Sequence, residues 1–337
     1  MIKLRTLSLV ALPLLVAVGC SQPETTVPPT AEAPVVNTPT PTAPKLRVVA
    51  ANSVLCDLTR QVGGDRLDLV CLIPAGQAPH EYKPTAEDAK QIETAQVVFY
   101  GGYNFEEGLT KLVGKSKGLV VAVSEQAIPK PIMVEGGHGH GHHHHDHDHG
   151  KAMAPDPHVW HDAKNGIKMV QTIAQQLSKA DPQHADTYQQ NAQALIGELQ
   201  RLDTWIKNQV ATIPPERRKL VTTHDALRYY TAAYGISLQS ALLGISTTEQ
   251  ATPNRIAELV QAIRASGVPT IFAELTANPK LIEAVATEAQ VKIADTSLLT
   301  DGLAEAGQEG ATYQQMLIRN TRTIVQGLGG EFTPFQP

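Results

Sequence analysis

A long helical pattern in the middle of the chain constrains the fold more than any other feature. Apolar residues recur at steps of three and four between about Pro182 and Val210, as on one face of a helix. At 1.5 Å per residue, such a helix would be on the order of 40 Å long. Asp181 and Pro182 mark its start, and Pro214-Pro215 ends any continuation. One helix of this length predicts a rigid connection between the flanking segments, not the pair of flexible strands of a large hinge.

Short apolar strands alternate with helical segments on both sides of this helix. Eight strands are expected, at residues 46–50, 67–73, 97–100, 119–123, 220–222, 238–243, 270–273 and 291–294. This alternation is typical of parallel sheets with crossover helices. The predicted fold class is therefore α/β, with an N-terminal lobe over residues 45–180 and a C-terminal lobe over 213–337. Each lobe is expected to hold a mainly parallel sheet flanked by helices, and the helix at 181–212 to join them rigidly.

Capping residues mark where several other helices begin. Asn52 or Ser53 caps a helix that ends at about Val62. Thr85 caps another, with Asp88 at the third helical position as in a capping box. Further helices are expected at 225–234, from Pro253 to about 266, from Pro279 onward and at 313–327.

The N-terminus has the pattern of an export signal. Lys3 and Arg5 precede an apolar run over residues 7–18, which is too short to span a bilayer. The run leads into a Val-Gly-Cys triplet that ends at Cys20 and resembles the cleavage and lipidation site of bacterial lipoproteins. We therefore expect a signal peptide over residues 1–20. Two outcomes stay open: a lipid anchor on Cys20, or ordinary cleavage to a soluble periplasmic protein.

Composition separates a tether from a globular part. Residues 21–44 are rich in Pro and Thr with little charge, so they are expected to form a disordered tether. Overall, 42% hydrophobic and 18% charged residues fit a protein with a real core. The net charge of -5, with no basic block, argues against nucleic acid as a partner. Cys56 and Cys71 could form a disulfide in an oxidising compartment or remain two buried thiols.

A histidine-rich run from His138 to His149 holds eight histidines and two aspartates in twelve residues. Imidazole and carboxylate groups are ligands of zinc and similar metals. Glycines before and within the run make it flexible, so it would bind several ions loosely. An affinity tag and a merely solvated polar loop are the alternatives. The histidines of this loop, which spans residues 136–151, are His138, His140, His142, His143, His144, His145, His147 and His149.

Four short segments each place a metal-binding side chain just after a strand. His80 follows the second strand between two prolines, and the segment that carries His158 comes after the histidine-rich loop. His224 lies at the end of the strand at 220–222, and Asp301 lies in a late loop. In α/β sheets, ligands bind outside the carboxyl ends of the strands. A lone histidine is usually only a satisfied polar residue, but these four together predict a site with three histidines and one carboxylate between the lobes.

The same four segments resemble those of a known family. PHEYKPTAED, DPHVW, THDALRYY and LLTDGLAEAGQEGATYQQMLIRN are similar to the signature segments of metal-binding lipoproteins, the solute-binding components of zinc and manganese ABC importers. The resemblance extends from about residue 46 to 329. It implies two α/β lobes joined by a rigid helix, with a metal ion buried between them. It also implies a membrane permease as partner, and His80, His158, His224 and Asp301 as ligands.

The resemblance also bears on which ion is bound. Manganese-type members carry Glu where this chain has His224, and zinc accepts imidazole better than manganese does. The histidine-rich loop is a further zinc-type feature, whereas TTEQATPNRI and the Asp301 segment are more similar to the manganese subgroup. We therefore expect Zn²⁺ as the transported ligand, with Mn²⁺ as the alternative. Asp295 or water could replace Asp301 in the fourth position. His161, where members usually carry an apolar residue, could be a spare ligand, but it is expected to support the structure or a ligand.

Two other classes of function remain to be weighed. A zinc hydrolase would need a general base beside a metal-bound water, and the chain has no His-Glu-x-x-His motif, so no enzymatic activity is expected. An adhesin or a periplasmic metal buffer is the other alternative. In the favoured interpretation, the loop at 136–151 collects zinc as an auxiliary site while the site between the lobes carries the transported ion. The chain is expected to act as a monomer, touching the membrane only through a lipid anchor on Cys20.

Overall fold

Four parallel strands form the sheet of the N-terminal half. The computed structural model describes residues 44–135, 153–249 and 251–336. In order across the sheet, the strands are β2 (Leu67–Cys71), β1 (Leu46–Ala50), β3 (Val97–Tyr100) and β4 (Leu119–Ala122). The central strand β1 pairs in parallel with both β2 and β3. The parallel sheet predicted from the sequence is therefore confirmed, although β2 ends two residues earlier than expected.

Both faces of this sheet are buried, because successive residues of a strand point to opposite sides. Val48 and Phe99 belong to one apolar cluster, whereas Val49 and Val98 belong to another. A parallel sheet needs helices over both faces to bury such side chains. The helices of this half are α1 (Ser53–Gly63), α2 (Ala86–Thr94), α3 (Glu107–Val113) and α4 (Val123–Ala127).

Local capping explains where several helices begin. The side chain of Asn52 accepts a hydrogen bond from the backbone of Leu55 and caps α1. Thr85 and Asp88 form the expected capping box at the start of α2. Thr252 caps α8 (Pro253–Ser266), with proline in the first turn. These helix starts follow from residues within one turn of the boundary, which is why the sequence predicts them well.

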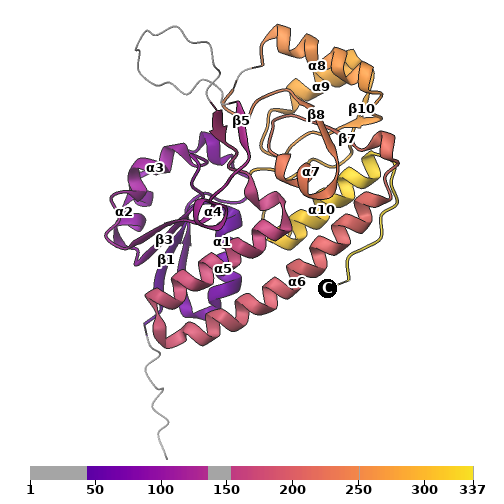
Figure 1. Cartoon of the computed structure of the whole chain (residues 1–337). Coiled ribbons are helices and arrows are strands. Elements are labelled where there is room, and N and C mark those ends of the chain that lie inside the picture. Colours follow the sequence, from indigo (N-terminus) through magenta and orange to yellow (C-terminus); the bar gives the residue numbers. More distant parts are fainter. Residues whose placement is uncertain (1–43, 136–152, 250, 337) are drawn as a thin grey trace, which may run out of the picture. The chain divides into compact units, whose positions relative to one another are not determined.

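Two antiparallel helices connect the halves of the molecule. The predicted long helix is α6 (Ala185–Ala211), and it packs along α5 (Ala163–Ala180), which the sequence interpretation did not include. A tight turn over Pro182–His184 joins the two helices, and Figure 1 shows them side by side. α6 also contacts α1 and α10 (Tyr313–Gly327). The long helix is therefore part of the core rather than an isolated rod.

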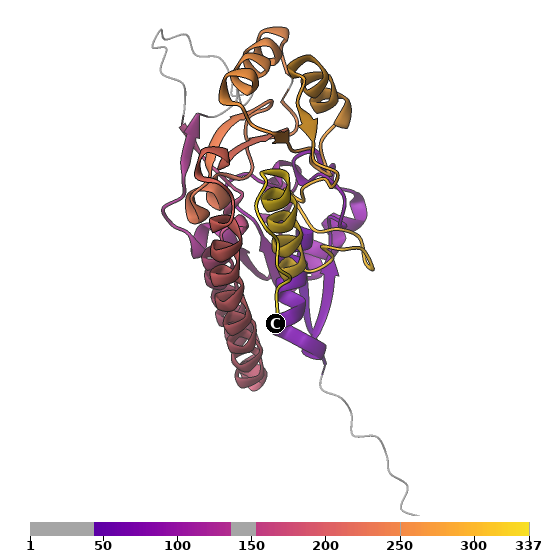
Figure 2. The same cartoon turned by 90° about the vertical axis from the view of Figure 1, so that its right-hand side faces the viewer.

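The C-terminal half repeats the strand and helix alternation with shorter strands. β7 (Lys219–Thr222) pairs in parallel with β8 (Ser237–Ala241), and β9 (Thr270–Ile271) with β10 (Lys292–Ile293). A single parallel bridge between Thr222 and Phe272 links the two pairs. The helices of this half are α7 (Arg228–Tyr234), α8, α9 (Pro279–Ala289) and α10. Figure 2 shows α8 and α9 together at one end, while α10 runs beside α6.

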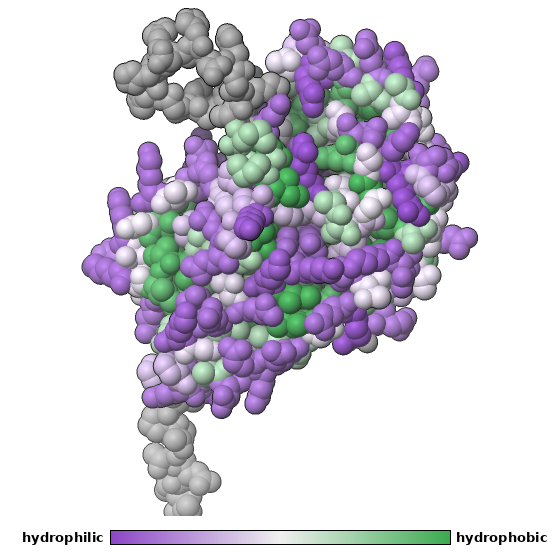
Figure 3. Space-filling view, viewed as in Figure 1, coloured by the Kyte–Doolittle hydropathy of each residue, from purple (hydrophilic) through white to green (hydrophobic). Residues whose placement is uncertain are grey.

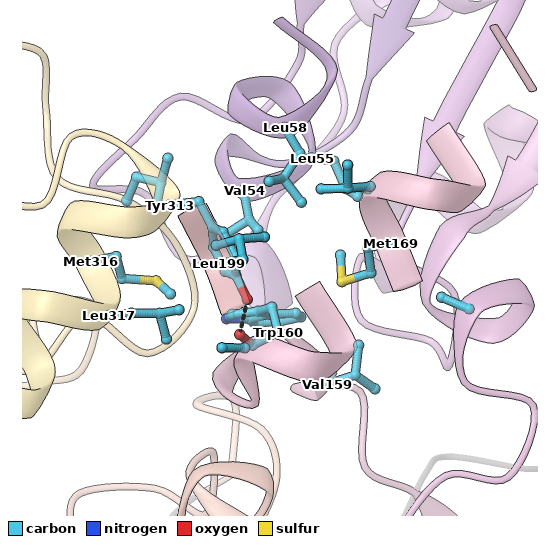
Figure 4. Close-up of a cluster of buried hydrophobic side chains, with 14 of the residues drawn as sticks. Val54, Leu55, Leu58, Val159, Trp160, Met169, Leu199, Tyr313, Met316 and Leu317 are labelled. Carbon is cyan, nitrogen blue, oxygen red and sulfur yellow. Dashed lines mark hydrogen bonds between the residues drawn. The ribbon is translucent and has the colours of Figure 1, made fainter. Parts of the chain in front are cut away.

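One apolar cluster joins elements from both halves. Trp160 lies at its centre among side chains of α1, α5, α6 and α10, as Figure 4 shows. The Tyr313 hydroxyl donates a hydrogen bond of 2.6 Å to the backbone oxygen of Trp160. Burying each large apolar side chain contributes about 1.5–3 kcal/mol to folding. The described residues belong to one compact unit, and this shared core explains why.

Of the remaining local features considered from the sequence, the structure describes the two cysteines and the segments on either side of the histidine-rich run. Cys56 of α1 and Cys71 of β2 are joined in a disulfide, with their Cα atoms 5.7 Å apart, which is one of the two alternatives considered. A short antiparallel hairpin, β5 (Met133–Glu135) and β6 (Met153–Pro155), flanks the histidine-rich run. The run itself, the export signal, Cys20 and residues 21–43 of the tether lie outside the described residues.

One face of the described part is mainly polar. On the face drawn in Figure 3, hydrophilic side chains predominate and apolar ones form small patches. No helix within residues 44–135, 153–249 and 251–336 has the length and apolar character needed to cross a membrane.

Candidate metal centre

Four side chains from distant parts of the sequence meet in one buried cluster. His80, His158, His224 and Asp301 each offer a ligand atom, and these atoms lie within 4.8 Å of one another. The Nε2 atoms of His80 and His158 are 3.3 Å apart. Asp301 Oδ1 lies 3.1 Å from His224 Nε2, 3.4 Å from His158 Nε2 and 3.9 Å from His80 Nε2. Three nitrogens and one oxygen thus face a common centre, as tetrahedral coordination of a metal ion requires.

Short loops bring these side chains to the same place. His80 lies in a single helical turn, Pro79–Glu81, in the loop after β2. His158 follows β6, and His224 follows β7 by two residues. Asp301 comes three residues after the bridge between Glu274 and Leu298. His80 and His224 therefore occupy the carboxyl ends of parallel strands, where the α/β architecture predicts a ligand site.

Buried carboxylates hold two of the histidines in a fixed orientation. His158 Nδ1 donates to Asp156 Oδ1 over 2.8 Å. Glu274 accepts one hydrogen bond from the His224 backbone, at 2.8 Å, and another from His224 Nδ1. A proton on Nδ1 leaves the lone pair of Nε2 free for a metal ion. The sequence interpretation missed both carboxylates as supporting residues, although Asp156 lies in the DPHVW segment and Glu274 directly follows an expected strand.

Burial and neighbouring charges shift the pKa values of the four side chains in opposite directions. Burial lowers the pKa of His80 to about 3, against the opposing effect of Asp301. Burial also disfavours the charged forms of His158 and His224, but the neighbouring carboxylates outweigh it. The pKa of His158 is raised, and that of His224 is raised well above its ordinary value of 6.5. Burial opposes ionisation of Asp301 as well, yet His224 and His158 hold the pKa of its carboxyl well below 3.8.

Aromatic rings and a further hydroxyl complete the surroundings of the cluster. Phe105 packs edge-on against His80 and His158, with ring centroids 4.9 and 5.6 Å away. The Thr276 hydroxyl donates to Asp301 Oδ2 over 3.0 Å. The side chains of His158, His224 and Asp301 are fully buried, and that of His80 is 7% exposed. An ion held here would be almost completely removed from water.

Two other residues considered from the sequence lie outside the cluster. Asp295, the rival carboxylate, is exposed and lines a separate surface pocket beside β10. His161 is fully buried, and its Nε2 lies 2.8 Å from the backbone oxygen of Thr300. Burial lowers the pKa of His161 to about 3, so its ring is neutral. His161 therefore contacts the residue next to Asp301 without joining the four grouped side chains.

Comparison with known proteins agrees with this architecture. The family described as zinc-uptake complex component A, periplasmic, matches residues 48–327. The chain belongs to this family. Its members are substrate-binding components of transporters, so the protein is a metal-binding transport component and not an enzyme.

Individual relatives extend the comparison. The metal ABC transporter substrate-binding lipoprotein ScbA of Streptococcus cristatus is 35% identical over 292 residues, which cover 84% of this chain and 89% of the relative. The manganese ABC transporter substrate-binding lipoprotein PsaA of Streptococcus pneumoniae has the same 35% identity and the same coverage. Both relatives thus match the chain along almost its whole folded length.

Solved structures confirm the fold class. The periplasmic zinc binding protein TroA from Treponema pallidum matches with a TM-score of 0.77 and 30% identity, over 84% of this chain and 99% of TroA. Fe(III)-bound YtgA from Chlamydia trachomatis matches with a TM-score of 0.74 and 25% identity, over 86% of this chain and 100% of YtgA. These relatives are named for different ions, so family membership by itself does not assign the ion.

Proposed function

We propose that this protein binds Zn²⁺ outside the cytoplasm and delivers it to the membrane permease of an ABC importer. His80, His158, His224 and Asp301 are the proposed ligands. Three neutral imidazoles and one carboxylate match the tetrahedral sites that zinc forms in proteins. The Asp301 carboxylate offsets one of the two positive charges of the ion, which lowers the cost of burying it. The proposed ion is cargo, so the site must release it as well as bind it.

The observation that carries the choice of zinc is the imidazole of His224 beside Asp301. Its Nε2 lies within the cluster, 3.1 Å from Asp301 Oδ1. Manganese favours oxygen ligands, whereas imidazole suits zinc. The similarity to TroA, which is named a zinc binding protein, supports this choice. The manganese lipoproteins among the relatives make Mn²⁺ the alternative.

Segments outside the described residues have proposed roles in the same process. We propose that the eight histidines between His138 and His149 collect zinc loosely and pass it to the buried site. Cys20 is proposed to carry a lipid anchor, as in the lipoprotein relatives, and residues 21–44 to serve as a tether. The lobes at 45–180 and 213–337, joined by the helix at 181–212, are proposed to act as one monomeric carrier.

A competitive metal titration tests the function directly. The protein lacking residues 1–20 and a matched variant also lacking 136–151 would be titrated with Zn²⁺ in the presence of excess Mn²⁺. One tight zinc equivalent in both proteins, not displaced by manganese, is the expected result. A preference for manganese in the loop-deleted protein would support the alternative ion. Loss of all tight binding on loop deletion would instead support a metal buffer.

A single substitution provides a matched test of the ligand that decides between the ions. His224→Glu replaces the imidazole with a carboxylate while Asp301 stays in place. We expect this variant to lose zinc affinity relative to manganese, because the donor set becomes richer in oxygen. An unchanged ratio of the two affinities would mean that His224 does not contact the ion.

A further inference from the structure

The backbone oxygen of Thr300 accepts two hydrogen bonds from the segment that follows His158. His161 Nε2 donates over 2.8 Å, and Trp160 Nε1 donates over 3.2 Å. A carbonyl oxygen has two lone pairs, so these donors fill its capacity. Thr300 directly precedes Asp301 in the sequence. The two donors therefore connect the His158 segment to the Asp301 segment, which lies 139 residues from His161 and 140 from Trp160 at the Thr300 contact.

The side chain of Thr300 extends the connection to a third proposed ligand. Its hydroxyl donates to Glu274 Oε2 over 3.2 Å. Glu274 in turn accepts hydrogen bonds from the backbone and the ring of His224. Thr300 and Glu274 are both buried, so water does not compete for these bonds. One residue thus links the positions of His158, His224 and Asp301.

His161 is an unusual choice for its buried position. Because its Nε2 donates to a carbonyl, its Nδ1 carries the free lone pair. Within the described residues, Nδ1 is buried and has no hydrogen-bond partner. Leaving a buried acceptor unpaired opposes folding. An apolar ring of similar size would fill the same space without that penalty. What such a ring lacks is the N–H group that donates to Thr300.

We propose that His161 is a positioning residue that fixes Asp301 relative to His158 and thereby slows release of the bound ion. The ring supplies the stronger of the two bonds to Thr300 by distance, while Trp160 keeps the carbonyl satisfied if His161 is replaced. The proposal rests on the proposed metal-binding function but not on which ion is bound. It predicts an effect on dissociation of the ion rather than on folding, because the unpaired Nδ1 offsets what the hydrogen bond contributes to stability.

Dissociation kinetics of the full mature chain test this role. Zn²⁺ release into a fluorescent chelator would be followed by stopped flow for wild type, His161→Phe and His161→Gln. The phenylalanine variant keeps a planar ring but cannot donate, whereas the glutamine amide can donate to Thr300. We expect His161→Phe to release zinc about tenfold faster, with the association rate and the melting temperature of the metal-free protein unchanged. His161→Gln should release zinc at nearly the wild-type rate.

Each outcome distinguishes this proposal from the proposed function. Zinc release from His161→Phe at the wild-type rate would overturn the positioning role while leaving zinc binding intact. Release from His161→Gln as fast as from His161→Phe would do the same. A wild-type protein without a tight ion would overturn the proposed function, and the positioning role with it. His161→Leu provides a second side chain that cannot donate if the phenylalanine variant does not fold. Nitrogen-15 NMR of the wild type should show the Nε2-protonated ring of His161, and the opposite tautomer would contradict the proposal.

Discussion

His80 and His224 occupy corresponding places in the two halves of the molecule, but different forces hold them. Each lies in a loop after a strand, and the Nε2 atoms lie 3.9 and 3.1 Å from Asp301 Oδ1. His80 packs against the ring of Phe105, and burial lowers its pKa to about 3. His224 is bound by Glu274, and the two carboxylates raise its pKa well above 6.5. His80 is thus a neutral side chain positioned by packing, whereas His224 is positioned by charge.

Replacing each histidine by alanine should have the largest effects and should distinguish packing from charge. We expect His224→Ala and His80→Ala both to abolish tight metal binding in the loop-deleted protein. Only His224→Ala should greatly destabilise the metal-free fold, by about 3–5 kcal/mol, because it removes the ring that lies between the buried carboxylates of Glu274 and Asp301 and compensates their charge. Titration calorimetry and urea unfolding at pH 6 would measure both effects. Equal losses of stability in the two variants would contradict the distinction between charge and packing.

The pH dependence of binding should reflect His224 and His158 but not His80. The raised pKa values of these two histidines mean that an incoming ion must displace their protons. Zinc affinity should therefore fall by about a hundredfold or more between pH 7.5 and 5.5, with between about one and two protons released per ion. Calorimetry in buffers of different ionisation enthalpy counts these protons. A count near zero at pH 6 would show that the histidines are already neutral.

The same pKa shifts predict opposite pH trends for the two forms of the protein above pH 6.5. A raised pKa of His224 stabilises the metal-free fold below 6.5, and that contribution is lost as the pH rises through the folded-state value. The metal-bound form should instead gain stability, because binding strengthens. Melting temperatures between pH 6.5 and 9 would measure both trends. Parallel trends in the two forms would argue against protonated histidines in the metal-free site.

Glu274→Gln should weaken binding less than loss of a ligand. The amide keeps the shape of the side chain but removes the charge that orients His224 and favours its Nδ1 proton. We expect zinc affinity to fall by about 10–100-fold, as for other groups that support metal-bound histidines. Asp68→Asn, which alters an exposed carboxylate paired with Arg47, is the matched control. An effect no larger than that of the control would mean that packing alone orients His224.

Phe105→Leu should have the smallest effect and should act by loosening the packing of His80 and His158. The substitution removes edge-on aromatic contacts worth about 0.5–1.5 kcal/mol each. Zinc affinity should fall about three- to tenfold, while the pH dependence of binding stays the same because the carboxylates are untouched. Binding titrations at several pH values would test this. A changed pH profile would show that Phe105 also affects the pKa values of His158 and His224.

Much of this fold could be predicted from local patterns, and the omissions have physical causes. Caps such as Asn52 and Thr85 act within one turn, so the helix starts were predicted well. Helix α5 was missed although its buried residues Val170, Ile173 and Leu177 recur at helical spacing. The predicted strand at 270–273 is longer than β9, because an apolar run does not reveal where ladder hydrogen bonds end. The supporting carboxylates Asp156 and Glu274 gave no signal beyond lying next to strands or ligands.

The sequence alone determined which side chains could bind a metal, the order of the segments that carry them, and the long helix between the halves. Local residue types and spacings encode all three. Only the tertiary structure decided that Asp301, and not Asp295, meets the three histidines. It also decided which histidines have raised pKa values and that His161 donates to Thr300. These properties depend on distances between groups far apart in the chain, which are set by how the two halves pack on their shared core.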